Sequence, residues 1–314
     1  MNFNIPILFL TYKRYKTAIR VFNAIRKIKP KKLYFASNAP KGNEEIYEVK
    51  KVRNIINQVD WNCKIITIFH KNHMLVKDSI PTSINFFFSK EKLGIILEDD
   101  CLPSINFFVF CKKMLLFYEY DKYINSICGS RFIKNKNKSD IYLSKYNHVW
   151  GWATWRSRWK KFDPKIKFWP EYKKSKSFEF LNPDKEEFNY WKSVFNKTYE
   201  QKINTWDYAW TACSWYNKQL SVIPPVSLIQ NIGFGSDATW TVAKNKFIKK
   251  KRENKIYFNI LKPIERNIEN DRHVFLQLFK GEFLGFKLRL IYLIKLFFED
   301  PITFFYKLKR KINA

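Results

Sequence analysis

The first 100 residues divide into short apolar runs and longer segments in which apolar residues recur at helical spacing. The apolar runs end in polar residues and predict strands at 5–14, 32–42, 63–69 and 93–100. The segments between them predict helices at 17–28, 44–58 and 80–90. Strands that alternate with helices indicate an α/β domain with a parallel sheet covered by helices. Because ligands bind at the carboxyl ends of such strands, we expect the loops after residues 10, 36 and 97 to meet at one edge.

The second half of the chain has shorter patterns and more aromatic residues. Residues 141–160 are rich in aromatic side chains, residues 161–205 are lysine-rich with a helical or loop pattern, and residues 221–241 have the Pro and Gly residues of strands and loops. A lysine-rich run at 244–255 has the composition of a solvated linker. We therefore divide the chain into a main domain at 1–243 and a basic, amphipathic C-terminal extension at 244–314.

The C-terminal extension contains an apolar stretch, starting near residue 281, that predicts a helix followed by a basic tail. Lys287, Arg289 and Lys295 interrupt this stretch and leave no apolar span of 18 or more residues, so we expect no transmembrane helix. Two alternatives stay open. The helix lies in a membrane interface, or it packs on the main domain.

The chain is strongly basic, with 58 Lys and Arg residues against 28 Asp and Glu residues and a net charge of +30. This charge favours a polyanionic partner such as nucleic acid, an anionic membrane surface or a phosphorylated substrate. A bias of the kind that an AT-rich genome produces is an equally good explanation, because the basic residues are spread along the whole chain. Charge alone therefore does not select a partner.

The five cysteines are widely spaced and form neither a CxxC pair nor a metal-type cluster. Their spacing is typical of a reduced, cytosolic protein in which they serve as small apolar residues. The N-terminal segment has no basic region before its short apolar stretch, so we expect no signal peptide. The expected location is the cytoplasm.

Three carboxylates, Glu98, Asp99 and Asp100, directly follow the most apolar predicted strand. Mg²⁺ and Mn²⁺ prefer oxygen ligands, and a cation held by one or two carboxylates keeps positions open for substrate phosphates. An acidic cluster at the edge of a sheet is costly unless a cation compensates it. The pattern predicts a diphosphate-binding metal site. The alternative is a solvated acidic turn that caps a helix at 103–118.

Six segments share their order and local pattern with a known group of enzymes: PILFLTYKR, LYFASNAPKG, KLGIILEDDCLPS, HVWGWATWRSRWKKFDP, NTWDYAW and NIGFGSDATWT. They resemble segments of bacterial GT-A glycosyltransferases that use nucleotide-diphospho-sugars. These enzymes look like relatives of the N-acetylglucosaminyltransferase I family. The resemblance covers about residues 5–243. It implies an α/β fold with a Rossmann-like mixed sheet flanked by helices, here followed by a C-terminal helical extension. It also implies a Mn²⁺ or Mg²⁺ cofactor and inverting sugar transfer to a bacterial surface glycan such as lipopolysaccharide or capsule.

On the donor side, the resemblance implies roles for the acidic cluster and for the loop after the first strand. Asp100 matches the acid that holds the metal against the diphosphate, Asp99 an acid near the ribose and Glu98 an acid near the donor sugar. Arg14 matches a basic residue that contacts the nucleotide. The expected donor-binding residues are Thr11, Arg14, Asn38, Glu98 and Asp99.

On the acceptor side, the resemblance implies that Asp207 is the general base that deprotonates the acceptor hydroxyl. The role is physically reasonable, because a carboxylate beside a Trp can be desolvated enough for its pKa to rise. The alternatives are a surface helix carboxylate at 207 and Asp237 as the base. Gly151, Trp152 and Trp206 are expected to face the sugar or acceptor, although an ordinary core position is the alternative for any one Trp.

Three residues depart from the family pattern. Asn38 stands where an Asp that contacts the base is usual, His73 stands where a Gly is usual, and Trp240 stands where a His is frequent. The departure at Asn38 concerns recognition of the nucleotide base, the one at His73 concerns the loop over the donor, and the one at Trp240 removes a possible phosphate or metal contact. None of these departures changes Asp100 or Asp207.

The expected partners are a nucleotide-diphosphate sugar, a glycan or lipid-linked glycan acceptor and an anionic membrane contacted peripherally at its inner face. Nucleic acid is not expected, because the chain has no recognisable nucleic-acid motif and no single basic stripe. A basic nucleic-acid-binding protein is nevertheless the alternative from another class. A metal-dependent nucleotidyltransferase is a further alternative, since it would also hold Mg²⁺ with acids on a strand.

Overall fold

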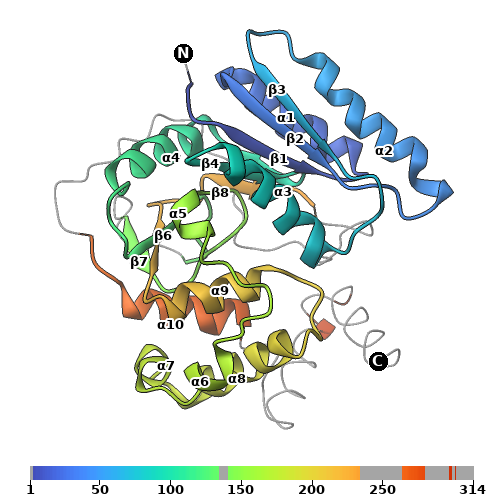
Figure 1. Cartoon of the computed structure of the whole chain (residues 1–314). Helices are drawn as coiled ribbons and strands as arrows, with labels where there is room; N and C mark the ends of the chain where they lie inside the picture. Colours follow the sequence, from blue (N-terminus) through green and yellow to red (C-terminus); the bar gives the residue numbers. More distant parts are fainter. Residues whose placement is uncertain (1–2, 134–140, 234–263, 280–296, 299–300, 302–314) are drawn as a thin grey trace.

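The computed structural model describes residues 3–133, 141–233, 264–279, 297–298 and 301 (Figure 1). The strands are β1 (Ile7–Thr11), β2 (Lys32–Ser37), β3 (Lys64–Phe69), β4 (Leu93–Glu98), β5 (Cys101–Pro103), β6 (Ile124–Cys128), β7 (Tyr142–Ser144), β8 (Trp152–Trp155), β9 (Leu220–Ile223) and β10 (Ile229–Asn231). The α-helices are α1 (Tyr15–Ile28), α2 (Ile46–Arg53), α3 (Val76–Lys90), α4 (Ile105–Phe117), α5 (Arg156–Trp159), α6 (Trp169–Tyr172), α7 (Lys176–Leu181), α8 (Lys185–Tyr199), α9 (Asp207–Tyr216) and α10 (Ile268–Val274). Two 3-10 helices, η1 (Asn43–Glu45) and η2 (Asn54–Gln58), and one π-helix, η3 (Phe275–Phe279), complete the described elements.

Eight strands form one mixed sheet in the order β3-β2-β1-β4-β8-β6-β9-β7. The four strands predicted from the first 100 residues pair in parallel, β3 with β2, β2 with β1 and β1 with β4. Strand β8 then runs antiparallel to both β4 and β6, which makes the sheet mixed. A separate small sheet pairs β5 with β10. The predicted fold class, an α/β protein with a Rossmann-like mixed sheet flanked by helices, is confirmed.

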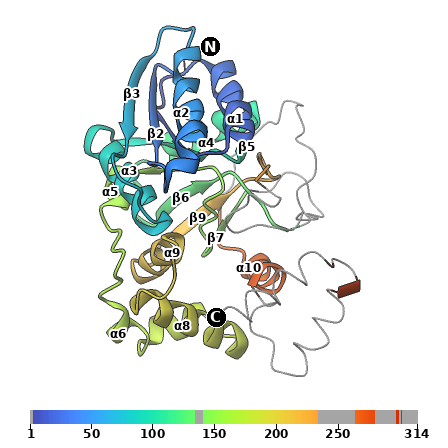
Figure 2. The same ribbon diagram turned by 90° about the vertical axis from the view of Figure 1, so that its right-hand side faces the viewer.

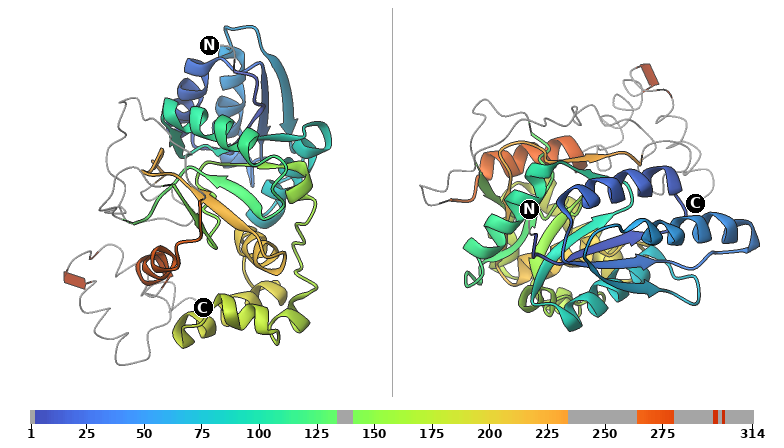
Figure 3. Two further views of the ribbon diagram at one scale, coloured as in Figure 1. Left: turned by 90° about the vertical axis from the view of Figure 1, so that its left-hand side faces the viewer. Right: turned by 90° about the horizontal axis from the view of Figure 1, so that it is seen from above.

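Both faces of the sheet are buried at its central strand β1, as the alternation of its side chains shows, whereas the edge strand β3 is exposed or half-buried. Ile7 and Phe9 belong to the core on the side of α1 and α4, while Leu8 and Leu10 belong to the core on the side of α3, α8 and α9. Figure 2 shows α1 and α2 on one face of the sheet and α3 on the other. Helices α6 to α10 gather away from α1 and α2 (Figures 1 and 3). A strand that is covered on both faces needs the continuous apolar run that predicted β1.

Two predicted helices differ in extent from the observed ones. The segment 44–58 is a short α-helix with 3-10 turns on both sides, because the chain tightens at helix ends rather than continuing one regular helix. Helix α3 begins at Val76 rather than at residue 80. Its first turn contains the polar residues Lys77 and Asp78, so the apolar periodicity starts only after the helix has begun.

Part of the C-terminal extension packs on the main domain. The segment before α10 covers the edge of β7, where Leu143 N donates to Glu265 O at 3.0 Å and Asn267 N donates to Leu143 O at 3.0 Å. Asp271 of α10 is buried and accepts hydrogen bonds from Ser144 Oγ at 2.5 Å and Arg266 Nε at 2.8 Å. The helix predicted near residue 281, with a membrane interface and packing on the main domain as its two alternatives, lies outside the described residues.

Two further observations bear on the location of the protein. In the part of the chain that the structure describes, none of the helices has the length and apolar content needed to cross a bilayer. All five cysteines are unpaired, and Cys101, Cys111, Cys128 and Cys213 are buried. They pack as small apolar residues, as their spacing suggested.

Candidate active site

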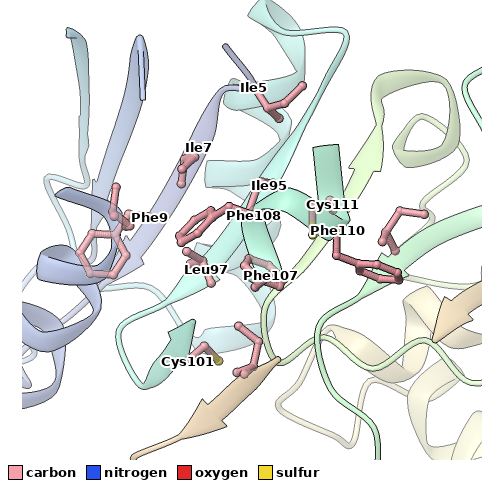
Figure 4. Close-up of a cluster of buried hydrophobic side chains, with 14 of the residues drawn as sticks. Ile5, Ile7, Phe9, Ile95, Leu97, Cys101, Phe107, Phe108, Phe110 and Cys111 are labelled. Atoms are coloured by element: carbon pink, nitrogen blue, oxygen red, sulfur yellow. The ribbon is translucent and has the colours of Figure 1, made fainter. Parts of the chain in front are cut away.

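The acidic cluster lies at the carboxyl end of β4, in the middle of the large sheet. Leu97 and Cys101, which flank the three acids, belong to the core between β4 and α4 (Figure 4). Asp99 is buried with 3% of its surface exposed, whereas Glu98 and Asp100 are half-buried. The strand therefore fixes the backbone of the cluster in the core and directs its carboxylates to the edge of the sheet.

Arg14 joins the acidic cluster from the neighbouring loop. Strands β1 and β4 pair with Leu10 opposite Glu98, so the loop after β1 lies beside the acids. The Arg14 guanidinium forms an ion pair with Asp99 Oδ1 and a second one, at 3.0 Å, with Asp100 Oδ2. Two donor-side predictions from distant parts of the sequence thus meet in one ion-pair network.

The electrostatics of the cluster follow from burial and crowding of like charge. Burial raises the pKa of Glu98 to about 8, and the charges of Asp100 and Asp99 add to this rise. Burial also raises the pKa of Asp99 to about 6, although the Arg14 guanidinium opposes the rise. One guanidinium therefore does not compensate three adjacent carboxylates. The donor set fits a hard divalent cation, which prefers carboxylate oxygens and would supply the missing positive charge.

Asp100 is the residue best placed to hold such a cation, because its carboxylate is less buried than that of Asp99. Within the described ranges, no group of three or more His, Cys, Asp or Glu side chains is arranged so that it could hold a metal ion by itself. A cation at Asp100 would therefore take most of its ligands from substrate phosphates and water.

The start of the NIGFGSD segment covers Asp100, a contact that the sequence did not reveal. Ile232 N donates to Asp100 O at 2.8 Å, and Gly233 N donates to Asn231 Oδ1 at 2.9 Å. A Cβ on Gly233 would lie 2.3 Å from Asp100 Oδ2 and 2.7 Å from Arg14 Nη1. Only glycine allows the backbone to approach the carboxylate so closely. The alternative base Asp237 and the departure at Trp240 lie outside the described residues.

A second polar cluster beside the site was also missed by the sequence analysis. Tyr12 N donates to Asp99 Oδ2 at 3.3 Å, and the Tyr12 hydroxyl donates to Glu45. Glu45 also accepts from Lys13 Nζ at 2.7 Å and from Lys41 N at 2.8 Å. Although burial acts to raise it, these hydrogen bonds lower the pKa of Glu45 to about 2. His73, one of the departures, lies 3.3 Å from the Tyr12 hydroxyl through Nδ1.

A small pocket with a cavity volume of about 30 Å³ opens beside Thr11 and Asn38 at the carboxyl ends of β1 and β2. Its polar lining also includes His70 and Ser83, whose Nε2 and Oγ are 3.1 Å apart. Burial lowers the pKa of His70, so the ring is neutral at neutral pH. A cavity of this size holds about one or two water molecules.

Thr11 and Asn38 line this pocket, but their polar groups also have partners within the protein. Thr11 Oγ1 donates to Ala36 O at 2.8 Å. Asn38 Nδ2 donates to Met74 O at 2.8 Å, and its Oδ1 accepts from Met74 N at 3.2 Å and Ala39 N at 3.0 Å. The amide of Asn38 thus fastens the loop after β3 to the end of β2.

Asp207 is the first residue of α9 and is half-buried. Its Oδ1 accepts hydrogen bonds from the Thr205 hydroxyl and, at 3.1 Å, from Tyr208 N. Burial raises the pKa of Asp207 against the effect of these bonds. The charge of Asp207 in turn contributes to the raised pKa of Glu98, so the two carboxylates lie near enough to interact although they come from different elements.

The three residues expected to face sugar or acceptor instead take part in the core. Trp152 and Trp206 are only 1% and 3% exposed, and their rings stack with centroids 5.7 Å apart. In this structure their rings pack against other protein side chains. Trp206 also lines a pocket together with Lys77 and Thr205.

Gly151 is required by the fold rather than by a ligand. It adopts a positive φ of 63°, and a Cβ there would lie 2.5 Å from Ile229 Cδ1. Its carbonyl accepts from Gly129 N at 2.8 Å. His148 is buried, and burial lowers its pKa to about 3.

No protein-family model and no curated protein matches the chain. Among solved structures, apo-UDP-glucose pyrophosphorylase is similar at 11% identity and a TM-score of 0.37, over 73% of this chain and 93% of that chain. HddC from Yersinia pseudotuberculosis is similar at 8% identity and a TM-score of 0.32, over 49% of this chain and 77% of that chain. The 4-diphosphocytidyl-2C-methyl-D-erythritolsynthase from Anaerococcus prevotii shows 7% identity and a TM-score of 0.33, over 49% and 72%. Likenesses of this size assign neither a family nor an activity, and the functional argument rests on the site.

Proposed function

We propose that the protein is a metal-dependent glycosyltransferase that moves a sugar from a nucleotide-diphosphate donor to a glycan acceptor, with inversion at the anomeric carbon. The observation that supports the proposal is that Asp207, the first residue of α9, lies near enough to the acidic cluster after β4 for its charge to raise the pKa of Glu98. Glu98, Asp99 and Asp100 form an undercompensated cluster, and Asp207 approaches it from the start of α9 with a raised pKa. A cluster for a cation and a separate carboxylate for a proton are what such a transfer needs.

The donor fits the polar edge in two parts. The nucleotide base would lie over the polar surface beside Thr11, Asn38 and His70, while the diphosphate lies at Asp100. The Arg14 guanidinium, which pairs with Asp99 and Asp100, can turn from these carboxylates to a phosphate oxygen. A divalent cation at Asp100, when bound, balances the negative charge of the diphosphate.

Asp207 supplies the proton transfer. The acceptor hydroxyl oxygen forms a bond to the anomeric carbon while the bond from that carbon to the diphosphate oxygen breaks. The hydroxyl proton passes to the Asp207 carboxylate, and the electron pair of the broken bond leaves with the nucleoside diphosphate. Because Thr205 and Tyr208 donate to one carboxylate oxygen, the other oxygen is available for the acceptor.

The test is nucleotide release by the full-length protein from a panel of nucleotide sugars, with Mn²⁺, with Mg²⁺ and with a chelator. We expect Asp100→Asn to abolish metal-dependent turnover. Asp207→Asn should lower kcat about 10²- to 10⁴-fold with little change in donor KM. Asp60→Asn is the matched control, because Asp60 is an exposed carboxylate paired only with Arg26.

The outcomes separate the competing functions. Full turnover by Asp100→Asn, or turnover that ignores the chelator, contradicts the metal assignment. Equal losses of kcat and donor affinity in Asp207→Asn remove it as the base. Pyrophosphate release from a nucleoside triphosphate and a sugar phosphate would replace glycosyl transfer by nucleotidyl transfer, which the same acids would serve.

A further inference from the structure

One nitrogen atom of Arg14 lies where two carboxylates of the acidic cluster converge. Its Nη2 forms an ion pair with Asp99 Oδ1 and a second one, at 3.0 Å, with Asp100 Oδ2. The two acids follow β4 and Arg14 follows β1, and these two strands lie side by side in the sheet (Figure 1). A point within reach of two carboxylate oxygens from different residues is also the kind of place that a hard divalent cation takes.

The other oxygen of each carboxylate is engaged by the protein. Asp99 Oδ2 accepts a hydrogen bond from Tyr12 N at 3.3 Å, and Asp100 Oδ1 accepts one from Cys101 Sγ at 3.4 Å. Asp99 Oδ1 and Asp100 Oδ2 are therefore the oxygens with which the two acids can bind a cation together. Both of these oxygens are in contact with Arg14 Nη2.

The chain itself closes one side of this point. A Cβ on Gly233 would lie 2.3 Å from Asp100 Oδ2 and 2.7 Å from Arg14 Nη1, so the backbone there packs against both groups. Only 21% of the Arg14 side chain and 4% of the Asp99 side chain are exposed. The guanidinium and a cation cannot both occupy this place, because they would need the same oxygens and their positive charges repel each other.

The charges beside this point attract a cation more strongly than one guanidinium can answer. Three consecutive carboxyl groups, at positions 98 to 100, lie beside the single guanidinium. Lys13, the neighbouring basic residue of the loop, is engaged with Glu45 at 2.7 Å. A divalent cation compensates the acids better, but it has to displace the guanidinium first. A diphosphate gives the guanidinium another partner, because arginine binds phosphate oxygens through two parallel hydrogen bonds.

We propose that Arg14 is an internal substitute for the cation: it holds Asp99 and Asp100 until a nucleotide diphosphate draws it away and thereby opens both carboxylates to the divalent cation. This inference deepens the proposed function and rests on its assignment of a cation to Asp100. Binding of cation and donor is then cooperative, because each ligand favours the arrangement in which Arg14 has left the carboxylates. Without the donor, the protein has little affinity for the metal alone.

The test is the affinity of the full-length protein for Mn²⁺ alone at pH 8, measured from the loss of the EPR signal of free Mn²⁺. We expect Arg14→Met to bind Mn²⁺ at least about tenfold more tightly than the wild type, because no positive charge has to be displaced. Asp100→Asn in the Arg14→Met background should remove this gain. The matched control is Arg26→Met, which removes a guanidinium paired with Asp60 at an exposed site and should bind Mn²⁺ as the wild type does.

Arg14→Gln is a second variant in case methionine prevents folding. Its amide still donates a hydrogen bond to a carboxylate but carries no charge, so we expect the same gain in Mn²⁺ affinity. In the wild type, UDP, GDP, CDP and dTDP are added in turn. At least one of them should tighten Mn²⁺ binding beyond the complex that the nucleotide forms with Mn²⁺ in free solution.

Equal Mn²⁺ affinities of the wild type, Arg14→Met and Arg14→Gln would overturn the proposal. So would wild-type binding that none of the four nucleotides tightens. Nucleotide release from nucleotide sugars is measured in parallel on the wild type. Metal-dependent release together with equal affinities would refute the substitute role and leave the proposed transfer standing, whereas a gain in Arg14→Met without any release would do the reverse.

Discussion

Replacing Arg14 by methionine tests whether the acidic cluster is as crowded as its geometry indicates. The substitution keeps most of the apolar stem and removes the guanidinium that pairs with Asp99 and Asp100. Breaking a buried ion pair by removal of one partner costs about 3–5 kcal/mol, because the other charge stays buried. We expect Arg14→Met to lose this amount of unfolding free energy at pH 8.

The pH dependence follows from the raised pKa of Asp99. Burial lifts it from 3.8 to about 6 even with Arg14 in place, so ionised Asp99 costs the folded state about 3 kcal/mol. The folded state binds the proton more tightly than the unfolded state does. Stability from this group is therefore greatest at low pH and falls as the pH rises from about 4 to about 6. Without Arg14 the pKa rises further, and the fall extends to higher pH.

The loss caused by Arg14→Met should accordingly be smaller at pH 5 than at pH 8. In part of this pH range the variant still holds a proton that the wild type has lost. Each pH unit of this range reduces the difference in unfolding free energy between the two proteins by about 1.4 kcal/mol. The assay is urea unfolding of both proteins, followed by tryptophan fluorescence at a series of pH values. Arg26→Met is the control, since Arg26 pairs with Asp60 at an exposed site, and we expect little change at any pH.

If Arg14→Met loses the same unfolding free energy at pH 5 and at pH 8, the reasoning is refuted. Protonation of the acids would then not reduce the cost of removing the guanidinium. A loss no larger than that of the Arg26→Met control would show that the ion pairs with Asp99 and Asp100 are not buried in solution.

Two further changes test other parts of the structure. Gly233→Ala brings a Cβ to 2.3 Å from Asp100 Oδ2 and forces a shift of about 1 Å, so we expect turnover to fall by up to about 10²-fold. In Gly42→Ala the Cβ meets only the flexible end of a glutamate, and unchanged turnover there excludes a general effect. Lys145→Met leaves Glu187 buried without its 2.9 Å partner and should cost about 3–5 kcal/mol in urea unfolding. Lys145→Met/Glu187→Gln should recover part of that loss, and a larger loss in the double variant would contradict the pairing.

Much of the fold could be predicted from the sequence. The runs that became β1 to β4 and the helices between them follow from apolar spacing, which is a local property of the chain. The carboxylates of Glu98, Asp99 and Asp100 were recognisable for the same reason, because three acids after an apolar strand are visible in one short stretch.

The role of the aromatic residues was not predictable in this way. Trp152 beside Gly151 has the pattern of a sugar-binding pair, but burial depends on which elements pack around it. In the structure, Trp206 and Trp210, from a segment about fifty residues later, pack against the Trp152 ring. Gly151 is required because a Cβ there would collide with the side chain of Ile229. Such contacts are decided by the packing of whole elements, which residue spacing does not encode.

The sequence by itself determined which residues carry charge and which local segments become strands and helices. Only the tertiary structure decided that Arg14 pairs with Asp100 and with Asp99, which is 85 residues away in the chain. The same holds for the close approach of Gly233 to Asp100 and for the electrostatic interaction of Asp207 with Glu98. The physical reason is that the spacing of apolar residues in the sequence indicates only how one segment is buried. The residues of a site come from several segments, and the order of the strands in the sheet decides which of these segments lie side by side. Strand β4 lies beside β1 in the sheet, and α9 comes from the other half of the chain. This arrangement brings acidic and basic residues that are far apart in the sequence into one site.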